Sequence, residues 1–166
     1  IRVKGPNVML GYYENEEATK SALEPDGWFH TGDLARIDKD GFIYIAGRKK
    51  SVIVLNNGKN VFPEEIETLL NKVEGIKETF VYEKKEDDGD VKVCVEIVYD
   101  KEMIKDLYHI EDEEKIKEFL WKKVKEVNKL MPKYKYVREM IITEEELIKT
   151  TTLKIKRHEE IKKIFE

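Results

Sequence analysis

The sequence predicts an α+β protein in two parts: a β-rich strip over residues 1–49, and a small domain of short antiparallel sheets with flanking helices over residues 50–166. Three patterns indicate this class. Apolar residues alternate on both sides of Asp40-Gly41, as in a β-hairpin. Two further segments, 79–82 and 91–98, flank a turn-rich run and read as an antiparallel pair. Apolar residues recur at helical spacing from 112 to 130, so helices pack with sheets in a layered structure.

The first part begins with a strand end over residues 1–4 and a Gly-Pro-Asn turn. A short helix is expected over residues 15–23, with Asn15 as its N-cap and two glutamates in the positive first turn. Its inward residues are Ala18, Ala22 and Leu23. Pro25-Asp26-Gly27 ends this helix, and the hairpin follows over residues 34–46.

The second part is expected to begin with an apolar strand over residues 51–55 and a flexible turn over residues 56–60. A helix then opens at Pro63 and ends near Gly75. In the strand 91–98, one face is apolar at every second residue, and a later strand is expected over residues 137–142. A basic helix from about His158 completes the chain.

Composition excludes several classes of function. A net charge of -4 argues against a main role in binding nucleic acid. The single cysteine, Cys94, forms no internal disulfide and fits a core position in a cytoplasmic protein. The three histidines lie far apart without partners at metal-ligand spacing, so no metal site is predicted. The first residues contain neither an initiator Met nor a signal peptide, which leads us to expect a part of a longer polypeptide.

The hairpin places Asp33 and Arg48 at its two open ends, near each other. A carboxylate can accept hydrogen bonds from two neighbouring sugar hydroxyls, and a guanidinium can reach the same ribose or a phosphate with several donors. A nucleotide offers both groups. The plainer alternative is a surface ion pair worth under about 1 kcal/mol.

Five ordered segments resemble the adenylate-forming acyl-CoA synthetases, a family that includes luciferases and nonribosomal peptide adenylation domains. The segments are residues 3–13, 27–33, 40–48, 58–67 and 152–157, and they extend over nearly the whole chain. The pattern over residues 47–61 is most similar to long-chain fatty acyl-CoA synthetases. Val54 stands where luciferase-like and coumarate-type members carry lysine.

The resemblance implies a role for five residues. Asp33 matches the aspartate that binds the ribose hydroxyls of ATP and AMP, and Arg48 matches the arginine that supports the ribose and phosphate. Lys50 falls at the hinge about which the small domain swings between an adenylating and a thioester-forming pose. Gly58 matches the glycine near which the pantetheine arm of CoA passes. Lys154 matches the catalytic lysine that reaches the acyl carboxylate and the α-phosphate of ATP.

The chemistry implied for Lys154 is physically sound, because a compact mobile cation can neutralise charge at the bridging oxygens during acyl transfer to phosphorus. One such contact is worth about 4 kcal/mol at an effective dielectric constant near 20. The alternative is a solvated basic face, because other cations surround Lys154. The family usually has glycine just before this lysine, whereas this chain has Leu153.

The family's phosphate loop ending in Pro-Lys-Gly and its Tyr-Gly-x-Thr-Glu segment do not occur here, so the ligands of the implied Mg²⁺ are absent. The resemblance therefore covers a C-terminal strip of the large AMP-binding domain over 1–49 and the mobile C-terminal domain over 50–166. The implied partners are the missing N-terminal large domain, ATP, CoA and a fatty acid, and the parent enzyme could associate peripherally with membranes.

The leading hypothesis is a fragment of an ATP-dependent fatty acid:CoA ligase that is inactive alone. A second hypothesis keeps adenylation but transfers the acyl or aminoacyl group to a carrier protein. A third is a stand-alone nucleotide-binding module. The acyl chain length is not predicted, because the acyl pocket belongs to the absent part.

Overall fold

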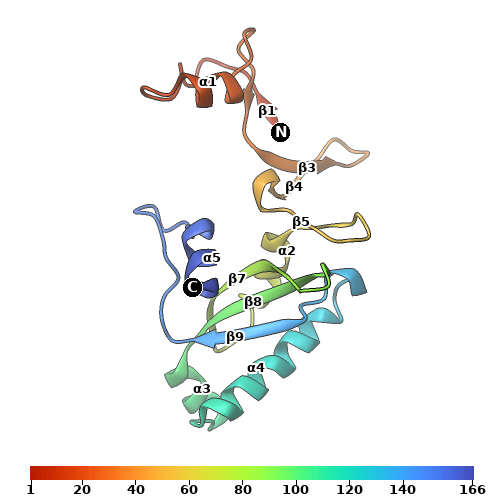
Figure 1. The fold of residues 1–166 in the computed structure, drawn as a ribbon, viewed down its shortest axis with the longest axis vertical. Helices are drawn as coiled ribbons and strands as arrows, with labels where there is room; N and C mark the ends of the chain where they lie inside the picture. The colour runs from red at the N-terminus through yellow and green to blue at the C-terminus, as the bar shows by residue number, and fades with distance from the viewer. The chain divides into compact units, whose positions relative to one another are not determined.

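The computed structural model describes residues 1–166, which form two compact units, Ile1–Val52 and Ile53–Glu166. The sequence-based boundary lies between residues 49 and 50. Helices and strands occur in both units, in agreement with the predicted α+β class (Figure 1).

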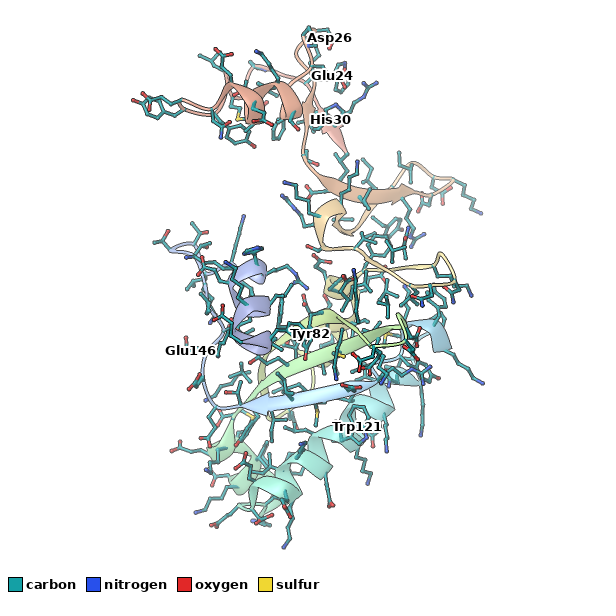
Figure 2. The ribbon with its side chains drawn as sticks, viewed as in Figure 1. Glu24, Asp26, His30, Tyr82, Trp121 and Glu146 are labelled. Carbon is teal, nitrogen blue, oxygen red and sulfur yellow. The ribbon has the colours of Figure 1, made fainter.

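The first unit contains two small antiparallel pairs and one helix. Strand β1 (Arg2–Val3) pairs with β2 (Phe29–His30), and β3 (Asp33–Ile37) pairs with β4 (Ile43–Arg48). Helix α1 (Glu16–Ala22) begins as predicted, because the Asn15 side chain accepts a hydrogen bond from the Ala18 N–H. Glu24, which follows α1 in the sequence, lies beside His30 of β2, with 2.7 Å between Glu24 Oε1 and His30 Nε2 (Figure 2).

The turn between β3 and β4 is held by one carboxylate. Asp38 accepts hydrogen bonds from the backbone N–H groups of Asp40 and Phe42, at 3.0 and 2.9 Å. Gly41 has a φ of +87°, which a glycine adopts without strain. The predicted hairpin is therefore confirmed, and local turn chemistry accounts for it.

The second unit is built on a three-stranded sheet in the order β7-β8-β9. Strand β7 (Ile76–Lys85) is antiparallel to β8 (Val91–Tyr99), as predicted. Strand β9 (Glu139–Thr143) is parallel to β8, so this one pair departs from the expected short antiparallel sheets. The reason is the long crossover between β8 and β9, which contains α3 (Lys101–Tyr108) and α4 (Glu113–Asn128).

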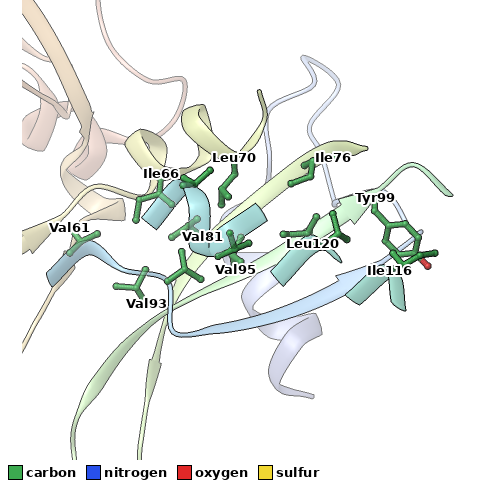
Figure 3. Packing of buried hydrophobic residues seen from close by; sticks show 14 of the residues in the cluster. Val61, Ile66, Leu70, Ile76, Val81, Val93, Val95, Tyr99, Ile116 and Leu120 are labelled. Atoms are coloured by element: carbon green, nitrogen blue, oxygen red, sulfur yellow. The ribbon is translucent and has the colours of Figure 1, made fainter. Parts of the chain in front are cut away.

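Helices cover both faces of this sheet. The larger hydrophobic core lies between the sheet and helices α2 (Pro63–Leu70), α3 and α4, and alternate residues of β8 point into it (Figure 3). Helix α5 (Arg157–Phe165) covers the opposite face. We call the buried cluster on that side the α5 layer; it consists of Phe80, Tyr82, Cys94, Val98 and Leu147, with Ile155 and Ile164 packed against it.

Several boundaries differ from those predicted. The strand expected over 51–55 is reduced to β5 (Ile53–Val54), which pairs with β6 (Asn60–Val61), because Lys49–Ser51 form a 3₁₀ turn. Helix α2 ends at Leu70 rather than near Gly75. Gly75 lies in the next turn with a φ of +90°, and a Cβ there would be 2.7 Å from Ile104 Cγ1. Helix α3 was not predicted.

Helix α4, with 16 residues, is the longest helix of the structure, and none of the helices is long and apolar enough to span a bilayer.

Candidate functional site

The base of the hairpin brings together the two residues that the sequence singled out. Asp33 opens β3 and Arg48 closes β4, and they face each other in the strand register. Arg48 Nη1 donates a hydrogen bond to Asp33 Oδ1 at 2.9 Å. The Arg48 side chain is 61% exposed and that of Asp33 is 26% exposed, so a ligand can reach both. The predicted proximity is confirmed.

The Thr31-Gly32-Asp33 segment shapes this pair. Gly32 has a φ of +76°, a left-handed conformation that favours glycine. Thr31 Oγ1 accepts the Asp33 N–H at 3.1 Å, and the Lys49 N–H donates to the Gly32 carbonyl at 2.8 Å. These contacts tie the start of β3 to the end of β4 and hold the carboxylate beside the guanidinium. Lys50 follows in the 3₁₀ turn, exposed, two residues before the first unit ends.

Gly58 lies in the second unit, at the tip of the turn between β5 and β6. Its φ is +74°, and a Cβ placed on it would meet no atom within 4 Å, so the backbone here is open to an approaching group. The turn is closed by a hydrogen bond from the Gly58 N–H to the Leu55 carbonyl at 2.8 Å. Asn56 donates to the Gly89 carbonyl at 3.0 Å, which ties this turn to the turn between β7 and β8.

A cavity of about 550 Å³ lies next to the Gly58 turn. The residues that line it include Asn56, Asn57, Tyr134, Tyr136 and Arg138. These side chains combine aromatic rings, amides and a cation. Such a surface can stack on a planar base and pair with a phosphate.

Lys154 lies on a tight turn directly before α5. The turn closes with a bridge between Lys149 and Ile155. Thr150 donates its N–H to the Lys154 carbonyl at 2.8 Å, and its Oγ1 accepts the Lys154 N–H at 3.2 Å. Leu153 has a φ of +60° and is 80% exposed. This is the position where the family usually has glycine, so the backbone keeps the conformation that glycine favours although the side chain differs.

Lys154 differs from most of the cations around it, because it has no carboxylate partner. It is exposed, and no ion pair involves its ammonium group. Of its neighbours, only Lys162 shares this property. The others are paired: Lys149 with Glu78 at 2.6 Å, Lys156 with Glu159 at 3.0 Å, Arg157 with Glu67 at 2.9 Å and Lys163 with Glu145 at 3.2 Å.

Arg157 anchors the end of the Lys154 turn, a role that sequence reasoning missed. Its guanidinium donates two hydrogen bonds to Glu67 of α2, at 2.9 and 3.3 Å, and a third to the Val81 carbonyl of β7 at 2.7 Å. Glu67 also accepts the Val81 N–H at 2.8 Å. The signal was present, because two family-like segments end in these opposite charges, Glu67 and Arg157.

The site residues fall into two groups. Asp33, Arg48 and Lys50 belong to the first unit, and Gly58 and Lys154 belong to the second. Within the second unit, Figure 1 shows the β5–β6 turn and the turn before α5 at opposite sides. No group of three or more His, Cys, Asp or Glu residues in the structure could hold a metal ion.

Comparison with known proteins identifies relatives of the whole chain. Residues 50–165 match the family described as AMP-binding enzyme C-terminal domain. The chain is 32% identical over 180 aligned residues to fatty acyl-CoA synthetase B of Dictyostelium discoideum, covering 100% of this chain and 26% of that protein. It is 34% identical to the medium-chain fatty-acid–CoA ligase of Escherichia coli K12, covering 93% of this chain and 25% of that protein.

A solved structure gives the same result for the fold. The crystal structure of ATP-bound MatB from Rhodopseudomonas palustris matches 99% of this chain and 29% of that chain, with a TM-score of 0.70 and 29% identity. The chain thus spans about a quarter of the length of these curated relatives.

Proposed function

The chain belongs to the AMP-binding enzymes, through the C-terminal domain of that family, and we propose that it forms the C-terminal part of an ATP-dependent fatty acid:CoA ligase. The observation that carries the proposal is the presentation of Lys154: an exposed ammonium group without a carboxylate partner, on a hydrogen-bonded turn, among cations that are mostly paired.

The proposed reaction has two steps. A carboxylate oxygen of the fatty acid attacks the α-phosphorus of ATP, the bond to the bridging oxygen breaks, and pyrophosphate leaves. The thiol sulfur of CoA then attacks the acyl carbon, loses its proton, and displaces AMP. Charge builds up at the phosphoryl and acyl oxygens in the first step, and the Lys154 ammonium neutralises it.

Asp33 and Arg48 bind the nucleotide in this proposal. The Asp33 carboxylate accepts hydrogen bonds from ribose hydroxyls, while Arg48 contributes donors to the ribose or phosphate. Their existing ion pair holds both side chains in position before the nucleotide arrives, which lowers the entropy cost of binding. Lys50 serves as the hinge in the exposed 3₁₀ turn that follows.

The acceptor is proposed to be CoA. Support comes from the open backbone at Gly58, past which a narrow pantetheine arm can run, and from the adjoining cavity. Tyr134, Tyr136 and Arg138 in that cavity suit an adenine ring and a phosphate. The fatty acid is proposed to be long-chain, on the pattern of residues 47–61; the medium-chain ligase among the relatives makes chain length a variable for the experiment.

The test is an assay of the full-length polypeptide that contains this chain. Pyrophosphate release and acyl-CoA formation are measured with a series of fatty acids that runs from short to long chains. Lys154→Ala is expected to slow adenylation about a thousandfold, which corresponds to about 4 kcal/mol. Lys162→Ala is the matched control, because Lys162 is also exposed and unpaired, and it should leave the rate unchanged.

Two further arms separate the alternatives. In the first arm, a holo carrier protein replaces CoA as the acceptor. Faster loading of the carrier than of CoA would favour the hypothesis of transfer to a carrier protein and reject CoA as the acceptor.

In the second arm, AMP is titrated against the 166-residue chain and its Asp33→Ala variant. The chain alone should release no pyrophosphate, because the phosphate loop and the Mg²⁺ ligands lie outside these residues. Acyl-CoA synthesis by the isolated chain would refute the proposal.

A further inference from the structure

Two carboxyl groups are buried together beneath α5. Glu96 projects from β8 into the α5 layer and is 3% exposed, and Glu160 projects from α5 and is 0% exposed. Glu160 lies close enough to Glu96 to raise its pKa. Glu96 Oε2 and Glu160 Oε1 have no hydrogen-bond partner in the structure. Two carboxylates in contact within an apolar layer cannot both carry a full charge without a large penalty.

Few charges face this pair. Lys163 of α5 lies 3.5 Å from Glu160 Oε1, and it also lies 3.2 Å from Glu145 in the segment before the Lys154 turn. On the sheet side, the strand partners of Glu96 are the apolar Phe80 and Ile141, and Tyr82 of β7 is a titratable neighbour. One shared cation therefore serves two buried carboxyl groups. Burial first, and Glu160 second, raise the pKa of Glu96 to about 7.

Glu160 makes one further contact, which links the pair to the candidate site. Its Oε2 accepts the backbone N–H of Ile148 at 2.6 Å. Ile148 directly precedes the Lys149–Ile155 bridge that closes the Lys154 turn, and its carbonyl accepts the Lys156 N–H at 2.8 Å. Glu160 thus fixes the base of the turn from inside the fold.

We propose that Glu160 is a positioning residue for the Lys154 turn, and that it keeps this position through one proton shared with Glu96. When Glu96 releases this proton to water, two negative charges face each other beneath α5, and the hold on Ile148 weakens. The importance of this device for catalysis rests on the role proposed above for Lys154.

The stability of the closed turn should depend on pH, because closing the turn changes the pKa of Glu96. The pKa of Glu96 lies higher in the folded chain than in an unfolded one, so the shared proton stabilises the closed turn at acidic pH, and this stabilisation is lost as the pH rises through about 7. For an opening that exposes Glu96 to water, linkage predicts about a tenfold fall in the protection of the Ile148 amide between pH 6 and pH 8.

Amide hydrogen exchange of the 166-residue chain tests this directly, with rates corrected for the intrinsic pH dependence of exchange. Wild type should show the tenfold fall. Glu96→Gln, which keeps a donor facing Glu160 at every pH, should remain protected and nearly independent of pH. Glu145→Gln is the control: it removes an exposed partner of Lys163 but leaves the buried pair, so its pH profile should keep the shape of the wild-type profile.

A flat wild-type profile, or a Glu96→Gln profile that falls like that of wild type, would overturn the inference. The glutamine side chain is close to glutamate in shape, so Glu96→Gln does not truncate a buried residue and should not unfold the chain. This readout is also independent of turnover. If the profile titrates as expected but Lys154→Ala leaves adenylation unchanged, the proposed function fails while the positioning device stands.

Discussion

Replacing Arg157 with glutamine is expected to destabilise the second unit by about 3 kcal/mol. The substitution removes a guanidinium that donates to both Glu67 oxygens and to the Val81 carbonyl. The Glu67 side chain is only 11% exposed, so its charge is left without a cation in a poorly hydrated place. Breaking such a pair on one side costs about 3–5 kcal/mol. The lower end applies, because the Arg157 side chain is 24% exposed and Glu67 keeps the Val81 N–H.

Urea unfolding measures the effect in the whole chain. Trp28 lies in the first unit and Trp121 in the second, so a Trp28→Phe background makes the fluorescence report on the second unit alone. Lys105→Gln is the control: it breaks an ion pair whose side chains are 56% and 69% exposed, and it should cost less than about 0.5 kcal/mol. A loss of under about 1 kcal/mol for Arg157→Gln would refute the idea that this pair anchors the turn.

Three further predictions concern backbone and burial. Leu153→Gly should stabilise the second unit by up to about 1 kcal/mol in the same assay, because it relieves a left-handed φ of +60° and loses little burial at 80% exposure. Gly75→Ala should destabilise it by about 2 kcal/mol or more, because the new Cβ would lie 2.7 Å from Ile104 Cγ1 at a φ of +90°. Cys94 should resist iodoacetamide at pH 8 until urea unfolds the chain, because it is buried and its thiol pKa is raised to about 11; rapid native labelling would contradict this.

Features fixed by neighbouring residues could be predicted from the sequence. The β3–β4 hairpin follows from Asp40-Gly41 and from a turn held by Asp38 alone. The N-terminus of α1 follows from Asn15. The proximity of Asp33 and Arg48 follows from the hairpin, whereas their direct pairing also depends on a bulge between Leu34 and Ala35, which shifts the register by one residue. In each case the interactions that decide the structure lie within a few residues or across one hairpin.

Features that depend on distant contacts were missed. Helix α3 is an exception, because its sequence carries a local signal that was overlooked: Met103, Ile104, Leu107 and Tyr108 recur at helical spacing, and Asp100 caps the N-terminus. Its C-terminal signal is weak, because His109 rather than glycine takes the left-handed position at its end. The parallel direction of β9 depends on the crossover through α3 and α4. Arg157 and Glu67 are 90 residues apart, and only the packing of α5 beside α2 and β7 brings them together.

Lys154 shows why sequence reasoning alone could not select the site residue on physical grounds. In the sequence, it is one lysine in a basic run, and only the resemblance distinguished it. In the fold, most cations of this run each have a carboxylate partner of their own, and these ion pairs hold the paired cations to the surface of the second unit. A free ammonium group can neutralise developing charge on a substrate, whereas a paired one must first give up its carboxylate. Because Lys162 is equally unpaired but lies within α5, the turn before that helix is what distinguishes Lys154: it sets the ammonium group off the helix on a segment whose base Glu160 and Arg157 hold in place.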